Sequence, residues 1–156
     1  MNVKLILNAA DLAKKWHEGQ VHTFGNESYF NMHLKPIAEI VKRLGYGAEY
    51  IAVAYLHDIK EDTSITDDEL LASGIPKDLV EAINLLAKKD NQSHEDYLKA
   101  ILTSPIAIVV KYCDSSFNFS STMLNSADIS EADFIRRSSK YAHNIATLAP
   151  MLPKIP

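Results

Sequence analysis

A short acidic stretch carries residue types that could bind a metal ion. His57 and Asp58 stand side by side at the end of the apolar run 48–56. A charge buried there is costly unless a partner or a metal ion neutralises it. At helical spacing Glu61 lies one turn beyond both residues, and Asp62 lies one turn beyond Asp58. The alternative is a solvated acidic helix end in which His57 only packs, but the whole cluster, placed after an apolar run, favours a metal site.

Two further residues of ligand type lie far away in the sequence. Pro36 is tolerated only in the first turn of a helix, so a helix must begin close to His33. Asp114 ends the apolar segment 106–114. Its carboxylate could simply pair with Lys111, three residues earlier, but its buried setting favours a metal ligand. Together with His57 and Asp58, these residues would provide two imidazoles and two carboxylates, a set suited to Mn²⁺, Fe²⁺ or Zn²⁺.

Such a site supports hydrolysis. A single cation with open coordination positions acts as a Lewis acid and lowers the pKa of bound water. Either Glu61 or Asp62, one turn beyond the ligand pair, could position or deprotonate that water. Hydrolysis of a phosphate ester suits the site, because the cation also neutralises phosphoryl oxygens.

The composition is that of an ordinary globular protein. The 156 residues are 47% hydrophobic, the net charge is −4, and Lys and Arg form no long run, so we expect no binding to nucleic acid or to an anionic membrane. The apolar runs are too short to span a bilayer, and the first residues lack the pattern of a signal peptide. A single cysteine, Cys113, excludes an internal disulfide and favours a structural role in a reducing cytoplasm. The oligomeric state is not indicated.

Apolar residues recur at helical spacing, which predicts an all-α fold of about seven or eight helices in a single domain, residues 1–156. Cap residues mark several helix starts: Thr66 with Glu69, then Ser93 and Ser130. The β-branched segment opened by Pro105 could also form a strand, but no second comparable run exists to pair with it. The expected helices run from Val3 to near Gly19, from near His33 to Gly45, from Ala48 through the acidic stretch, from Thr66 to Ala72, from near Leu79 to Ala87, from Ser93 past Ile101, from Pro105 to a polar loop at 122–129, and from Ser130 to Pro150.

These motifs resemble those of a known family. The order His33, then His57-Asp58, then Asp114 is that of the HD-domain phosphohydrolases. Within that family, residues 56–63 (LHDIKEDT) resemble the L-H-D-x-x-E-D-T signature of the hydrolase domain of RelA/SpoT-type proteins and of their small single-domain relatives of the metazoan SpoT-homologue type. Residues 17–20 (HEGQ) resemble H-x-G-Q, and residues 110–118 resemble V-K-x-A-D-x-x-x-N. The similarity extends from about residue 5 to residue 150.

The resemblance implies a Mn²⁺-dependent hydrolase that removes the 3′-pyrophosphate from (p)ppGpp. It implies a nucleotide as small-molecule partner and gives each motif residue a role. The metal ligands would be His33, His57, Asp58 and Asp114, the catalytic acidic pair Glu61 and Asp62, and the substrate contacts Asn118, Ser121, His22 in the first loop and Tyr141 on the last helix.

The sequence departs from the family where the substrate would bind. The first loop has His22-Thr23 in place of a basic pair, and Ser115 follows Asp114 where the family has an arginine. Arginine and neutral histidine are not equivalent for stacking or for phosphate binding. Two alternatives therefore stay open: an HD-type enzyme acting on a nucleoside monophosphate or another phosphoester, and a nucleotide-binding module without catalysis. Glu61 and Asp62 argue against the second alternative.

Overall fold

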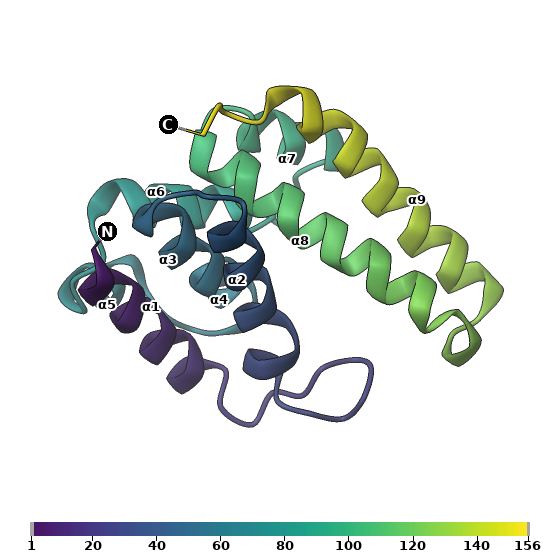
Figure 1. The fold of residues 1–156 in the computed structure, drawn as a ribbon, viewed down its shortest axis with the longest axis horizontal. Helices are drawn as coiled ribbons and strands as arrows, with labels where there is room; N and C mark the ends of the chain where they lie inside the picture. The colour runs from purple at the N-terminus through teal and green to yellow at the C-terminus, as the bar shows by residue number, and fades with distance from the viewer. Residues whose placement is uncertain (1, 156) are drawn as a thin grey trace.

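The computed structural model describes residues 2–155, and almost all of its regular structure is helical (Figure 1). No strand occurs in this range, and only an isolated bridge joins Val21 to Ser28 in the first loop. The predicted all-α fold is confirmed. The helices are α1 (Val3–Trp16), a π-helical turn (Phe30–Leu34), α2 (Lys35–Arg43), α3 (Ala48–Leu56), α4 (Ile59–Asp62), α5 (Asp67–Ala72), α6 (Lys77–Leu86), α7 (His94–Ile101), α8 (Pro105–Leu124) and α9 (Glu131–Leu148), with short 3₁₀ turns at Ser126–Asp128 and Ala149–Met151.

Local capping explains where several helices begin. Thr66 and Glu69 form a complete capping box at the start of α5, so two backbone N–H groups without helical partners are satisfied at once. Ser93 and Ser130 accept backbone N–H groups at the starts of α7 and α9. Pro105 occupies the first turn of α8, and the segment that could have been a strand is a helix.

Two helix ends differ from the prediction. α1 ends at Trp16, before Gly19, which has a φ of +81° and turns the chain back. α8 continues to Leu124, past the expected start of the loop at residue 122. Thr122 is buried and its hydroxyl donates to the carbonyl of Asn118, so the polar residues of this segment are accommodated within the helix, which packs along α9.

The core is centred on α3. This helix contacts α1, α2, α6 and α8, and residues 51–56 are all buried. An apolar surface on every side of the helix is what such a central position requires. The side chain of Cys113 is also buried in this core. α8 crosses the core with its first half and then extends with α9 as a helical hairpin beyond it (Figure 1). None of the described helices has the length and apolar character needed to cross a membrane.

Candidate metal centre

His57 and Asp58 lie at a break between two helices. We predicted a single helix through this stretch, but α3 ends at Leu56 and α4 begins at Ile59. The Nδ1 atom of His57 lies 2.7 Å from the carbonyl oxygen of Ala54, and Asp58 has φ −100° and ψ −1°, outside the usual helical values. The break turns both side chains toward one point, with Nε2 of His57 3.1 Å from Oδ2 of Asp58.

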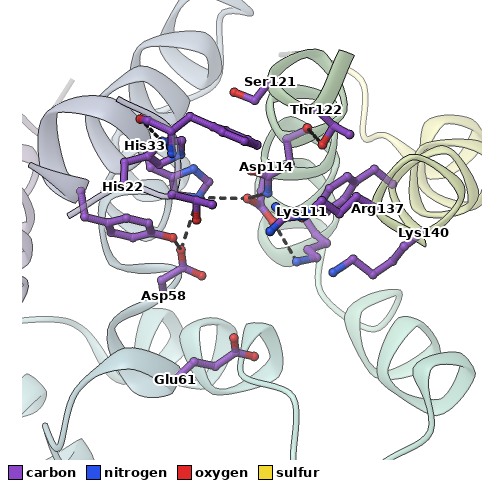
Figure 2. Close-up of a pocket in the computed structure, with 15 residues that line it drawn as sticks. His22, His33, Asp58, Glu61, Lys111, Asp114, Ser121, Thr122, Arg137 and Lys140 are labelled. Atoms are coloured by element: carbon purple, nitrogen blue, oxygen red, sulfur yellow. Dashed lines mark hydrogen bonds and ion pairs between the residues drawn. The ribbon is translucent and has the colours of Figure 1, made fainter. Parts of the chain in front are cut away.

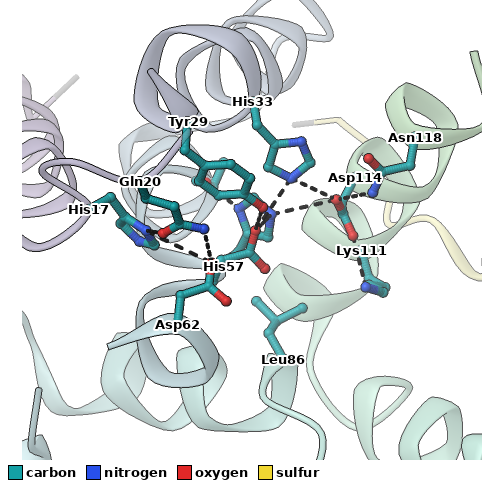
Figure 3. Close-up of polar contacts among 12 residues, drawn as sticks. His17, Gln20, Tyr29, His33, His57, Asp62, Leu86, Lys111, Asp114 and Asn118 are labelled. Atoms are coloured by element: carbon teal, nitrogen blue, oxygen red, sulfur yellow. Dashed lines mark hydrogen bonds and ion pairs between the residues drawn. The ribbon is translucent and has the colours of Figure 1, made fainter. Parts of the chain in front are cut away.

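Two distant segments bring the other candidate ligands to the same point (Figure 3). His33, on the π-helical turn, has its Nε2 atom 3.3 Å from Oδ2 of Asp58 and 3.2 Å from Oδ1 of Asp114. Nε2 of His57 lies 3.5 Å from the same oxygen of Asp114, which comes from the buried part of α8. The four residues therefore converge from three separate parts of the chain.

The hydrogen bonding of His57 leaves a lone pair directed at two carboxylates. A carbonyl oxygen only accepts, so Nδ1 of His57 carries a proton and donates it to Ala54. Nε2 is buried and has no aligned hydrogen-bond partner among the described residues, although Asp58 and Asp114 lie close to it. In a neutral imidazole this atom holds a lone pair that faces carboxylate oxygens, which is repulsive unless a proton or a cation lies between them.

The spacing of the donor atoms suits one cation. Ligands bound at about 2.0–2.2 Å around one ion lie roughly 3 to 3.5 Å from one another. The four contacts between imidazole nitrogens and carboxylate oxygens range from 3.1 to 3.5 Å. His33, His57 and Asp58 also offer ligand atoms that all lie within 4.8 Å of one another. These residues fit a divalent metal ion, and Asp114 would add a fourth ligand.

The four groups perturb one another strongly. Burial alone would lower the pKa of His33 and His57, but the carboxylates of Asp58 and Asp114 overcome this effect and raise the pKa of both imidazoles. Burial alone would raise the pKa of the two carboxyl groups, but the opposing charges hold it well below the usual range. The site therefore keeps both carboxylates ionised and attracts positive charge.

Asp114 uses its two oxygens differently. Oδ2 accepts from Lys111 at 2.8 Å, which is the structural pairing that the sequence offered as an alternative. Oδ1 accepts from the side-chain amide of Asn118 at 2.8 Å and faces the two imidazoles. Pairing with Lys111 therefore does not prevent Asp114 from serving as a ligand, because it fixes the orientation of the carboxylate.

Tyr29 supports the centre, a role that was not predicted from the sequence. Its hydroxyl donates to Oδ2 of Asp58 at 2.6 Å, and its ring stacks on that of His33 with 4.8 Å between centroids. Tyr29 is four residues before His33 and so lies on the same side of the π-helical turn. Helical spacing from His33 was the one signal in the sequence that could have pointed to it.

The acidic pair Glu61 and Asp62 points in two directions. Glu61 lines the cavity beside the centre (Figure 2). Its Oε1 accepts the backbone N–H of Lys88 at 2.7 Å. Burial raises the pKa of Glu61, which makes its carboxylate a better proton acceptor near neutral pH. Asp62 instead faces the turn after α1, where Gln20 donates to its Oδ2 at 2.9 Å (Figure 3).

A cavity of about 220 Å³ opens beside the centre. The four residues expected to contact substrate all line it: His22, Asn118, Ser121 and Tyr141. The rings of His22 and His33 are stacked, with 5.9 Å between their centroids. Asn144, three residues after Tyr141 on α9, does not line the cavity, since its side chain is buried between His94 and Ser115.

Three cationic side chains line the opposite wall of the cavity, and none of them was predicted from the sequence to contact substrate. They are Lys111 on α8 and Arg137 and Lys140 on α9 (Figure 2). Arg137 lies over the ring of Phe24, 5.8 Å from its centroid. Neither Arg137 nor Lys140 forms an ion pair with another described residue. Arg137, Lys140 and Tyr141 are three and four residues apart, a helical spacing that could have indicated a shared face.

Comparison with known proteins places the fold. No model of a known protein family matches the sequence. The chain is similar to a solved structure of a metazoan orthologue of SpoT, a protein that hydrolyses ppGpp and plays a role in starvation responses. The match covers 95% of this chain and 91% of that chain, with a TM-score of 0.71. The chain has the fold of that protein. The sequences are 16% identical, so the similarity is one of fold. The expected resemblance to the small RelA/SpoT-type hydrolases is confirmed at this level.

Proposed function

We propose that this protein is a metal-dependent phosphohydrolase that removes the 3′-pyrophosphate from (p)ppGpp or a related nucleotide. The observation that carries the proposal is the convergence of two imidazoles and two carboxylates, at 3.1 to 3.5 Å, beside a cavity with a cationic face. The shared fold with a ppGpp hydrolase supports the choice of substrate class.

The residues divide the chemistry among them. His33, His57, Asp58 and Asp114 would hold a divalent ion, of which Mn²⁺, Fe²⁺ and Zn²⁺ suit the donor set. The ion would lower the pKa of a bound water and neutralise phosphoryl oxygens. Glu61 enters the cavity from α4, and its carboxylate, with a pKa raised by burial, would accept the proton of the attacking water.

The opposite wall of the cavity selects an anionic substrate. Lys111 is already paired with Asp114, whereas Arg137 and Lys140 have no ion-pair partner among the described residues. Guanidinium groups bind phosphate with two parallel hydrogen bonds, and a lysine provides a point charge. Phe24 and Tyr141 add aromatic rings beside these cations, so the cavity offers contacts for both the phosphates and the base of a nucleotide.

A smaller phosphoester, such as a nucleoside monophosphate, is the second candidate substrate. The cavity volume of about 220 Å³ lies below the roughly 300–1,000 Å³ of typical ligand pockets. The first loop also contributes His22 and Thr23 rather than basic residues to the cavity. Both features favour a substrate with fewer phosphates.

A panel assay with purified, Mn²⁺-loaded protein tests the proposal. The substrates are ppGpp, pppGpp, GMP and AMP, with separate detection of pyrophosphate and orthophosphate. Release of pyrophosphate from ppGpp, lost in Asp58→Ala and kept in the exposed control Asp68→Ala, supports the leading substrate. Release of orthophosphate from the monophosphates alone supports the second candidate. Binding of nucleotides without turnover with Mn²⁺, Fe²⁺ or Zn²⁺ overturns the proposal in favour of a non-catalytic module.

A further inference from the structure

A buried histidine and a glutamine stand behind Asp62, outside the cavity. The side chain of His17 has no exposed surface, and its Nδ1 atom lies 2.7 Å from Oε1 of Gln20. The amide nitrogen of Gln20 lies 2.9 Å from Oδ2 of Asp62 (Figure 3). A chain of two hydrogen bonds therefore links His17, at the end of α1, to Asp62, the last residue of α4, which lies 42 positions beyond Gln20 in the sequence.

Only one arrangement of hydrogens satisfies both contacts. A carboxylate only accepts hydrogen bonds, so the amide NH₂ group of Gln20 must face Asp62. The amide oxygen then faces His17, and the ring must donate from Nδ1. The reversed amide would place its oxygen 2.9 Å from a carboxylate oxygen, which is repulsive. Nε2 of His17 is buried and has no partner among the described residues, so Nδ1 is the only ring nitrogen that is hydrogen-bonded.

The backbone holds this pair rigidly. Gly19, with φ +81°, reverses the chain after α1, and the N–H of Gln20 donates to the carbonyl of His17 at 3.0 Å. The carbonyl of Gln20 accepts the N–H of Tyr29 at 2.9 Å. The N–H and the carbonyl of Gln20 are therefore both held by main-chain hydrogen bonds. Gln20 connects the end of α1 to Tyr29, whose hydroxyl donates to Asp58.

The position of Asp62 gives its side chain little other support. It ends a helix of a single turn, and its side chain is 29% exposed. A carboxylate in that setting has free rotation about its side-chain bonds unless a partner holds it. Gln20 holds Oδ2 on the side of α1, and Oδ1 has no hydrogen-bond partner among the described residues.

We propose that Gln20, anchored by His17, is a positioning residue that orients the Asp62 carboxylate for the hydrolytic step. The proposal rests on the proposed function and on the role in the catalytic acidic pair that the resemblance implies for Asp62, but the hydrogen-bonded chain itself can be observed without turnover. His17, Gln20 and Asp62 do not line the cavity, so we expect substitutions of Gln20 to leave the binding of substrate nearly unchanged.

Three variants separate positioning from packing. Gln20→Leu keeps a branched side chain that is one atom shorter and removes both hydrogen bonds. Gln20→Glu keeps an oxygen for His17 but replaces the donor to Asp62 with a second carboxylate. Glu18→Gln, an exposed change in the same turn, is the matched control. Residues that support an active group in this way are typically worth about 10- to 100-fold in activity.

Imidazole ¹⁵N spectra and steady-state kinetics supply the readouts. The wild type and Gln20→Glu should show His17 protonated at Nδ1, and Gln20→Leu should lose that preference. Both Gln20 variants should lose about 10- to 100-fold in kcat with KM nearly unchanged, and Glu18→Gln should behave as wild type. Full activity in Gln20→Glu would overturn the proposal, as would a His17 tautomer that does not depend on Gln20. If the wild type turns over no substrate, the tautomer result still decides whether the chain of hydrogen bonds exists.

Discussion

Nε2 of His57 lies 3.1 Å from Oδ2 of Asp58, although the two residues are neighbours in the sequence. Adjacent residues in a regular helix point about 100° apart and do not face each other. They meet here because α3 ends before His57, whose ring donates to the carbonyl of Ala54, and α4 begins after Asp58. The interruption of the helix is therefore what brings the two side chains of the HD dipeptide together at one point.

Metal binding should stabilise the fold through this pair. In thermal unfolding, the wild type should become more stable as Mn²⁺ is added, by about 2.7 kcal/mol at a concentration 100 times the dissociation constant. Asp58→Asn should show no such shift, because it removes a charged ligand. The control Asp68→Asn changes an exposed carboxylate and should behave as wild type. If Mn²⁺ stabilised Asp58→Asn as much as Asp68→Asn, the metal would bind at another site.

Tyr29→Phe should weaken metal binding without removing a ligand. The change deletes only the hydroxyl that donates to Oδ2 of Asp58 at 2.6 Å. Partners of this kind are worth about 10- to 100-fold in metal affinity. Calorimetric titration with Mn²⁺ measures the effect, and Tyr112→Phe, whose hydroxyl bonds to no described residue, is the control. An unchanged affinity in Tyr29→Phe would show that Asp58 is oriented without the hydroxyl.

Two neighbouring arginines on α9 offer a matched test of the cationic wall. Arg137 lines the cavity, whereas Arg136 is exposed and pairs with Asp133 at 2.9 Å. Arg137→Met should raise KM for a phosphorylated substrate about tenfold or more, since hydrogen bonds to charged groups contribute about 1.5–3 kcal/mol. Arg136→Met should leave KM unchanged. Equal effects of both variants on KM would mean that the net charge of the helix, rather than contact in the cavity, attracts the substrate.

Acid should destabilise the protein partly through His94. Burial lowers the pKa of this ring, and the nearby Lys88, His143 and Lys140 lower it further, against the hydrogen bond to Asn144. Between the lowered folded pKa and the unfolded value of about 6.5, the unfolded chain binds more protons. The contribution of His94 to the free energy of unfolding is therefore fully present above pH 6.5, roughly the unfolded pKa, and is lost as the pH falls toward the lowered folded pKa.

Urea unfolding of the wild type and of His94→Gln at pH 7.5 and pH 5.5 measures this effect. Glutamine keeps an amide donor for Asn144 but does not titrate. The loss of stability between the two pH values should be smaller in the variant. An identical loss in both proteins would mean that His94 titrates normally in the folded state.

The sequence by itself determined the helices and the kinds of ligand. Caps at Thr66, Ser93 and Ser130 act on backbone groups within three residues, so their effect can be read from a short stretch. The apolar lead-in to His57 predicted a central helix, and α3 is buried on nearly all sides. Motif order selected His33, His57, Asp58 and Asp114, and the structure brings all four together.

Tertiary packing alone decided how those residues are oriented and what surrounds them. Nothing near Gln20 in the sequence shows that its amide reaches Asp62, and nothing near Arg137 shows that α9 forms a wall of the cavity. The break after Leu56 was also missed, because the same apolar and acidic pattern is compatible with one continuous helix. Contacts between remote segments depend on how whole helices pack, which periodicity within one segment does not encode. The residue types followed from local sequence, and their geometry followed from the fold.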